Sequence, residues 1–164
     1  MQRWRPAYVA LGSNLAEPAS QVERAIARLA GLPETRLVAR SRLWRTTPLG
    51  PRDQPDYVNA VAGLLTRLGP HELLAEFKRL EAAMGRLSPP VRWGPRVIDL
   101  DLVAFGEERL QEAGLDVPHP GVHERDFVLY PLAELAPALW IPGRGRVATL
   151  VRQVENRGLV PLER

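Results

Sequence analysis

Two aspartates, Asp99 and Asp101, stand two residues apart in the apolar stretch 98–105. The Leu, Ile and Val residues around them predict a β-strand, in which alternate residues share a face. Both carboxylates should therefore point the same way, while Leu100 and Leu102 face the core. Their backbones would lie about 6.6 Å apart, from a rise of roughly 3.3 Å per residue. Two carboxylates so placed can converge on one or two hard cations such as Mg²⁺, which shares its shell with substrate phosphates.

A Gly-Pro bend directly before this strand carries two arginines, Arg92 and Arg96, with Trp93 between them. Arginine presents a planar fork that fits phosphate oxygens, so the bend and the aspartates together indicate polyphosphate chemistry. The alternative is a solvent-facing strand edge whose acids form salt bridges with the two arginines. Asp-x-Asp alone is a common doublet and does not decide between these interpretations.

The composition narrows the class of protein. The 164 residues are expected to form one domain, 1–164. No apolar run approaches the length of a membrane span and the first six residues lack the apolar stretch of a secretory signal, so we expect a cytoplasmic protein. The absence of cysteine excludes disulfides, thiol catalysis and cysteine-bound metal. The net charge is only +3, with acidic residues interspersed throughout, so nucleic acid is not strongly indicated.

The periodicity of apolar residues predicts the order strand, helix, strand, strand, helix, strand. We expect strands over 7–11, 35–46, 57–66 and 98–105, and helices over about 18–31 and 69–85. A proline-rich loop at 47–56, a hairpin turn at 106–108, an extended piece at 117–120 and a short helix at 127–135 complete the pattern, and the remainder is weakly patterned. This order predicts an α+β fold: a ferredoxin-like βαββαβ antiparallel sheet with helices on one face and additional C-terminal strands or short helices. The opposite sheet face would then be free for a substrate cleft.

Five stretches in the same order and spacing carry a family resemblance. They are Ala-Leu-Gly-Ser-Asn-Leu at 10–15, Arg-Thr-Thr-Pro-Leu-Gly-Pro at 45–51, Asp-Gln-Pro-Asp-Tyr-Val-Asn-Ala at 53–60, the stretch 92–102, and Val-Pro-His at 117–119 with Arg125 and Phe127. Together they resemble 6-hydroxymethyl-7,8-dihydropterin pyrophosphokinase (2-amino-4-hydroxy-6-hydroxymethyldihydropteridine diphosphokinase). The resemblance implies diphosphate transfer from ATP to the hydroxymethyl group of the reduced pterin, giving AMP and the pterin diphosphate in tetrahydrofolate biosynthesis.

The resemblance also implies roles for particular residues. Those matched to catalysis are Arg86, Arg92, Arg96, Asp99 and Asp101, with both aspartates as ligands of two Mg²⁺ ions. Those matched to the pterin are Thr46, Pro48, Leu49, Tyr57, Asn59, Trp93 and Phe127, with Tyr57 and Phe127 sandwiching the ring. Those matched to ATP are Leu74, Lys78, Arg86, Trp93, Arg96, Leu102, Leu115, His119 and Arg125. Without the resemblance, the aromatics would be interpreted as core residues and His119 as structural.

Some positions depart from the family pattern. Ser88 replaces a further loop arginine, Pro89 and Pro90 stiffen a loop expected to move, and Pro120 follows His119. Glu81, one helical turn before Gly85, is expected to be a solvated helix residue.

Two other functions remain open: a palm-like nucleotidyl transferase, which also uses paired aspartates, and a noncatalytic RNA-binding module. Comparing the binding of reduced pterin with that of single-stranded RNA would separate these functions from the pyrophosphokinase, which selective pterin binding would favour. With the pyrophosphokinase, the expected partners are ATP and reduced pterin, without nucleic acid or membrane, and a monomer is expected.

Overall fold

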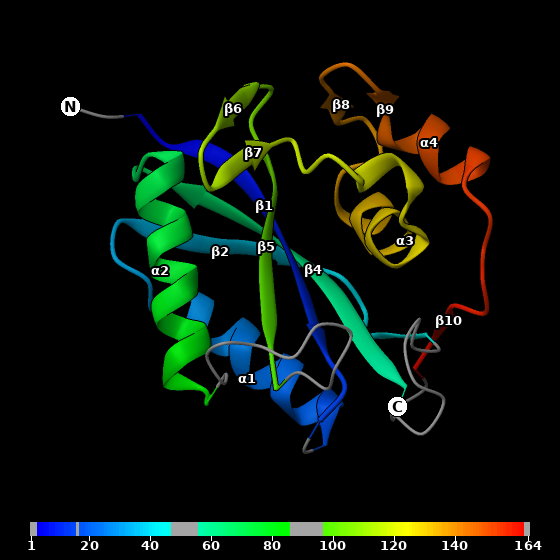
Figure 1. Ribbon diagram of the computed structural model, residues 1–164, viewed down its shortest axis with the longest axis horizontal. Coiled ribbons are helices and arrows are strands. Elements are labelled where there is room, and N and C mark those ends of the chain that lie inside the picture. The colour runs from blue at the N-terminus through cyan, green and yellow to red at the C-terminus, as the bar shows by residue number, and fades with distance from the viewer. Residues whose placement is uncertain (1–2, 16, 47–55, 86–96, 163–164) are drawn as a thin grey trace.

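An antiparallel sheet of six strands forms the centre of the computed structural model, which describes residues 3–15, 17–46, 56–85 and 97–162 (Figure 1). The strands follow the order β10 (Val160–Pro161), β3 (Trp44–Thr46), β4 (Tyr57–Thr66), β1 (Arg5–Ser13) and β5 (Asp99–Phe105), and β2 (Thr35–Arg40) pairs with the other end of β4. The predicted mixture of helices with an antiparallel sheet is confirmed. The first and fourth predicted strands are neighbours, as expected.

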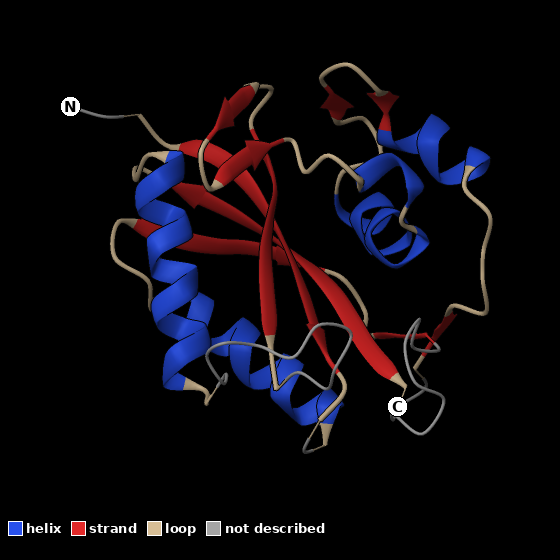
Figure 2. Ribbon diagram, viewed as in Figure 1, coloured by secondary structure: helices blue, strands red, loops and turns tan. Residues whose placement is uncertain are grey.

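Helices α1 (Pro18–Leu29) and α2 (Pro70–Ala83) cover one face of the sheet (Figure 2). Each begins with proline, whose missing N–H is not needed in the first turn of a helix. Each then buries one apolar stripe, which comprises Val22, Ala25, Ile26 and Leu29 on α1 and Leu73, Phe77 and Leu80 on α2. No helix within the described ranges is long and apolar enough to cross a membrane.

Helices α3 (Asp126–Leu135) and α4 (Val147–Gln153) belong to a second apolar cluster on the opposite side of the sheet. Val128 and Leu129 of α3 are buried in this cluster with Val61 of β4 and Val103 of β5. The expectation that this face is wholly free was wrong, because the apolar side of α3 covers part of it. The short helix itself was predicted at 127–135 and is confirmed, whereas α4 lies in the part of the sequence where the pattern was weak.

The long strand predicted over 35–46 is two strands, β2 and β3, separated by residues 41–43. Ser41 causes the break. Its N–H donates to the carbonyl of Val61 at 2.9 Å, and its Oγ accepts a hydrogen bond from the Val61 N–H at 2.9 Å. The serine side chain thus takes a place that a backbone carbonyl would hold in a regular ladder.

The turn after β5 does not make a hairpin of β5 and the next strand, contrary to the prediction at 106–108. Strand β6 (Leu110–Glu112) pairs instead with β7 (Leu115–Val117), around Gly114 at φ 80°. A second small hairpin, of β8 (Trp140–Ile141) and β9 (Gly145–Arg146), lies beside α4, and a 3₁₀ turn η1 (Val122–Glu124) precedes α3. In the view of Figure 1 the β6–β7 hairpin lies above the upper end of β5, and the β8–β9 hairpin lies above α3.

Candidate active site

Asp99 and Asp101 lie on the side of β5 that faces away from α1 and α2. Leu100 and Leu102 are 2% and 4% exposed in the core between the sheet and these helices, whereas Asp99 is half-buried and Asp101 is exposed. The predicted alternation is confirmed. Within the described part of the chain no three His, Asp or Glu residues gather as a ready metal site. Two carboxylates on one face suit a hard cation that completes its shell with water and phosphate oxygens.

Strand register brings Asp99 into one row with residues far away in the sequence. Asp99 is opposite Gly12 of β1, and Gly12 is opposite Asn59 of β4. Neighbouring strands are about 4.8 Å apart, so the backbones of Asp99 and Asn59 lie roughly 10 Å from each other across the glycine. Because Gly12 has no side chain, the row has a gap between a carboxylate and a carboxamide.

The side-chain amide of Asn59 is a buried hydrogen-bond donor. The residue is 6% exposed, and its Nδ2 donates a hydrogen bond to no acceptor among the residues described. Leaving such a donor unpaired costs about 1–3 kcal/mol, so this amide is suited to donate to a ligand. A Cβ at Gly12 would lie 3.2 Å from Asn59 Oδ1, which shows how closely the carboxamide rests on β1.

Asp101, His119 and Arg125 come together around one small hollow of about 10 Å³ on this side of the sheet. They belong to separate segments, namely β5, the piece after β7, and the residue before α3. The His119 N–H donates to the carbonyl of Val103 at 3.0 Å, which fixes the piece against β5. The structure therefore brings one predicted metal ligand next to two predicted phosphate contacts.

Arg125 is held by its surroundings. Its guanidinium carbon lies 5.6 Å from the centre of the Phe127 ring, within the range of a cation–π contact. A Cβ on Gly121 would lie 3.1 Å from Arg125 Nε, so the side chain rests directly on the glycine backbone. Gly121 was not among the predicted site residues.

The surroundings of His119 favour the neutral form of its imidazole. Burial lowers its pKa, and the nearby charge of Arg125 lowers it further, against smaller opposing contributions from Asp101 and Asp116. The Gly121 N–H donates to His119 Nδ1 at 3.1 Å. The proton of the neutral ring therefore sits on Nε2, which can donate to an anionic oxygen.

This lowered pKa predicts a pH dependence of stability. The unfolded chain, with a histidine pKa of about 6.5, takes up the proton more readily than the folded chain. The contribution of His119 is complete above that value and is lost as the pH falls through it toward the lower folded pKa. We expect the free energy of unfolding of the metal-free protein to fall more steeply than that of His119→Gln as the pH drops below about 6.5. Urea titrations at stepped pH measure this, and equal slopes would contradict it.

Residues matched to the pterin are partly placed together. Tyr57 shares the face of Asn59 by strand alternation, and Thr46 is its partner on β3. Phe127, half-buried, lies in the first turn of α3, where the buried Asp126 accepts hydrogen bonds from the N–H groups of Phe127 and Arg157, each at 2.8 Å. Asp126 thus fixes the start of α3 and the place of the aromatic ring.

Several residues matched to ATP, which the resemblance places around its adenosine, also lie near one another. Leu74, Leu102 and Leu115 belong to one apolar cluster with α2 and β7, and Lys78 lies exposed on α2. Leu102 and Leu115 are buried there. Their contact with a nucleotide stays a prediction.

Glu81 corrects the expectation of a solvated helix residue. It is 3% exposed, and its Oε2 accepts a hydrogen bond from the Leu100 N–H at 2.8 Å. Since β5 is the edge of the sheet, this carboxylate satisfies a backbone donor midway between the two aspartates. Its spacing of four residues from the buried Phe77 was the available sequence signal.

Several predicted site residues lie outside the described residues. They are Pro48, Leu49, Arg86, Arg92, Trp93 and Arg96. Their predicted roles, and the salt-bridge alternative for Arg92 and Arg96, therefore stay predictions.

Comparisons with known proteins identify the family. Residues 8–137 match the model of 7,8-dihydro-6-hydroxymethylpterin-pyrophosphokinase. The chain is 53% identical over 152 residues to 2-amino-4-hydroxy-6-hydroxymethyldihydropteridine pyrophosphokinase of Pseudomonas aeruginosa, covering 93% of each chain. It is 43% identical over 156 residues to the protein of the same name from Haemophilus influenzae, covering 95% of this chain and 97% of that one.

The fold matches a solved structure as well. The crystal structure of wild-type Plasmodium falciparum HPPK-DHPS with pteroate aligns with a TM-score of 0.73 at 13% identity, over 93% of this chain. This chain spans 43% of that longer chain, and at this identity the likeness concerns the fold alone. The family match and the curated relatives establish that the chain belongs to the 7,8-dihydro-6-hydroxymethylpterin-pyrophosphokinase family.

Proposed function

We propose that this chain transfers a diphosphoryl group from ATP to the hydroxymethyl oxygen of 6-hydroxymethyl-7,8-dihydropterin, as a step of folate synthesis. Family membership and the names of its relatives support the reaction. The structural observation that carries it is the row of Asp99, Gly12 and Asn59 across three strands. One end of this row suits a cation with phosphates. The other end offers a buried amide donor, unpaired among the residues described, that a heterocycle could accept from.

In this proposal the pterin lies against β4 and the start of α3. The amide of Asn59 would donate to an acceptor on the edge of the ring, which removes the cost of its unpaired state. Tyr57 and Phe127 would contact the ring faces, since flat heterocycles bind well between aromatic side chains. These contacts would direct the hydroxymethyl group toward the carboxylates of β5.

Asp99 and Asp101 would hold Mg²⁺, with two ions expected. When bound, the metal supplies charge neutralisation at the phosphates and a fixed orientation of the triphosphate. The hydroxymethyl oxygen forms a bond to the β-phosphorus of ATP and releases its proton to water. The bond from that phosphorus to the oxygen bridging to the α-phosphate breaks, and AMP leaves with that oxygen. The aspartates and the positions of the two substrates provide most of what such a transfer requires.

His119 and Arg125 would bind phosphate oxygens beside Asp101. The neutral imidazole donates from Nε2 and the guanidinium adds a fixed positive charge, so together they can orient an anion. Arg86, Arg92 and Arg96 would complete the phosphate contacts, and Trp93 would close over the nucleotide. Leu74, Lys78, Leu102 and Leu115 would border the adenosine.

The finer structural proposals follow from the same observations. Antiparallel β5, β1 and β4, with β2 and β3 beyond β4 and two helices on one face, support the ferredoxin-like classification. A single domain that acts as a cytoplasmic monomer on small molecules, without nucleic acid or membrane, stays our expectation.

The direct test of the reaction uses ATP labelled at the β-phosphorus. Diphosphoryl transfer moves this label to the pterin and leaves unlabelled AMP. If the label stayed in ADP, only the γ-phosphoryl group would have moved and the proposal would be wrong.

Gly12→Ala tests the gap between the two ends of the site. The new methyl would lie 3.2 Å from Asn59 Oδ1 and would tilt the carboxamide that is proposed to read the pterin. We expect the KM for the pterin to rise about tenfold with a smaller effect on kcat, because the lost contact belongs mainly to substrate binding. Steady-state kinetics at saturating ATP measure this.

Gly63→Ala is the matched control for that variant. It adds a methyl in the same sheet, but the added Cβ meets its nearest neighbour, Ala39, at an ordinary 3.5 Å. Equal pterin KM values for Gly12→Ala and wild type would show that the gap and the Asn59 position are irrelevant to pterin binding.

A further inference from the structure

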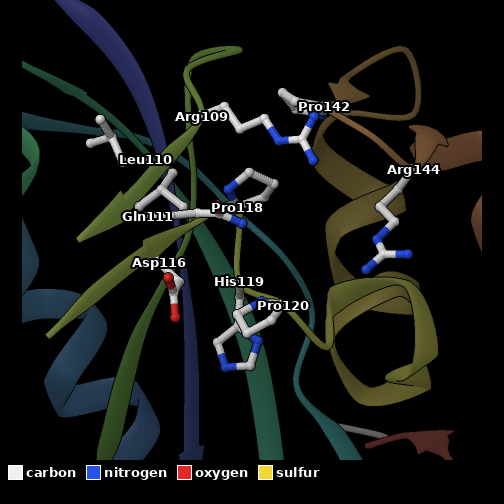
Figure 3. Close-up of a pocket in the computed structure, with 10 residues that line it drawn as sticks. Arg109, Leu110, Gln111, Asp116, Pro118, His119, Pro120, Pro142 and Arg144 are labelled. Atoms are coloured by element: carbon white, nitrogen blue, oxygen red, sulfur yellow. The ribbon is translucent and has the colours of Figure 1, made fainter. Parts of the chain in front are cut away.

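A cavity of about 160 Å³ opens between the β6–β7 hairpin and the turn between β8 and β9 (Figure 3). Its lining includes Arg109, Gln111, Asp116, Pro118, Pro142 and Arg144. No residue matched to catalysis or the pterin lines it, and His119 is the one residue it shares with the small hollow beside Asp101. The segment of Pro118 and Pro120 lies between the two guanidinium groups and the His119 ring (Figure 3).

Two arginines make one end of this cavity positively charged. Arg109, just before β6, extends toward the β8–β9 turn, and Arg144 extends from that turn along the opposite wall (Figure 3). Among the residues that the structure describes, no carboxylate forms an ion pair with either guanidinium. The carboxylate of Asp116 and the imidazole of His119 lie at the other end of the cavity (Figure 3). In the part of the chain that the structure describes, the end with the arginines therefore carries two exposed positive charges without a paired carboxylate.

The position of Arg109 depends on a glycine. A Cβ on Gly143 would lie 3.1 Å from Arg109 Nη2 and 3.3 Å from its Cζ, so the guanidinium lies on the backbone of Gly143. Gly143 has φ 78°, a conformation that side chains other than glycine rarely adopt. The turn that presents Arg144 thus also seats Arg109, and this pre-organisation reduces the entropy lost when an anion binds.

The size of the cavity limits the ligand. Pockets for drug-sized molecules usually measure about 300–1,000 Å³, and a single water needs only about 10–15 Å³. At about 160 Å³ the cavity has room for a small anion but not for a whole nucleotide. Guanidinium groups match phosphate oxygens in geometry and charge.

We propose that Arg109 and Arg144 form a second anion site, which takes a phosphate or diphosphate group and is separate from the site of diphosphate transfer. The proposal goes beyond the function above and does not rest on it. We expect the free anion to bind. A nucleotide carries the same phosphate chemistry, and the experiment distinguishes the two sources.

The test is calorimetric titration of the full chain with inorganic diphosphate, at physiological ionic strength and without divalent cations. We expect wild type to bind with a Kd below about 1 mM. Arg109→Gln and Arg144→Gln should each weaken binding about tenfold, because each removes a charge-assisted contact. Arg152→Gln removes the same charge from an exposed position on α4 and should bind like wild type. No binding, or equal binding by all four proteins, would overturn the proposal.

A second titration separates the two sources of the anion. A non-hydrolysable ATP analogue with Mg²⁺ should bind Arg109→Gln and Arg144→Gln as tightly as it binds wild type. If both variants lost affinity for the analogue about tenfold, the cavity would belong to the nucleotide site and the claim of a separate site would be wrong. Thermal unfolding of each variant verifies that the exposed substitutions leave the fold unchanged.

Discussion

Asp99→Asn and Asp101→Asn are each expected to lower kcat by about a thousandfold or more, because loss of a carboxylate weakens the hold on the cation that neutralises the transferring phosphates. Asparagine keeps the size of the side chain and removes its charge. Asp101 is exposed and Asp99 is half-buried, so neither supports the core in the way that Leu100 does. Steady-state assays with thermal unfolding measure the two effects separately.

The control for the aspartates is Glu107→Gln, at an exposed turn position directly after β5. It removes one negative charge near the same strand and should leave kcat within about twofold of wild type, since exposed charges act weakly through solvent. Pterin binding, measured without ATP, should survive in both aspartate variants. Wild-type turnover with Mg²⁺ in either aspartate variant would refute the metal assignment.

Glu81→Ala is expected to lower the free energy of unfolding by about 2–4 kcal/mol, which combines an unpaired buried N–H with a cavity. The carboxylate of Glu81 accepts from Leu100 N–H at 2.8 Å, on the edge strand that carries both aspartates. Against a typical total of about 5–15 kcal/mol, this is a large loss. Because Leu100 lies between Asp99 and Asp101, kcat should also fall, by about tenfold.

Two further variants separate the effect of losing the Glu81 hydrogen bond from the effect of removing a carboxylate or side-chain volume in general. Glu81→Gln keeps an acceptor oxygen and should cost about 1 kcal/mol. Glu76→Ala, on the same helix, removes a half-buried carboxylate that pairs with the exposed Arg79 and should cost less than about 1 kcal/mol. If Glu81→Ala were as stable as Glu76→Ala in urea titrations, the buried bond would have no structural importance.

The sequence predicted the parts of the site that follow from local periodicity. Asp99 and Asp101 share a face because side chains alternate along any strand, and Leu100 and Leu102 fill the core for the same reason. Both helices on the core face were predicted from apolar stripes of 3.6-residue period. Residues 35–46 were predicted as one strand because alternation cannot reveal a serine that binds the backbone of a neighbouring strand.

Features that depend on distant partners could not be predicted in this way. Glu81 was expected in solvent because carboxylates are usually exposed, and only the packing of α2 against the edge of β5 gives it a buried partner. Gly12 and Gly121 are important because they have no side chain. A Cβ at Gly12 would crowd Asn59, and a Cβ at Gly121 would crowd Arg125. Helix α3 covers part of the sheet face opposite α1 and α2, and this also depends on tertiary packing.

The most direct test of the central claim is AMP release from ATP and Mg²⁺, with and without 6-hydroxymethyl-7,8-dihydropterin. We expect one AMP for each pterin consumed, with a pterin diphosphate detected by mass and almost no AMP when pterin is absent. If folded wild-type protein released no AMP with both substrates, or released it equally without pterin, the proposed diphosphoryl transfer would be wrong.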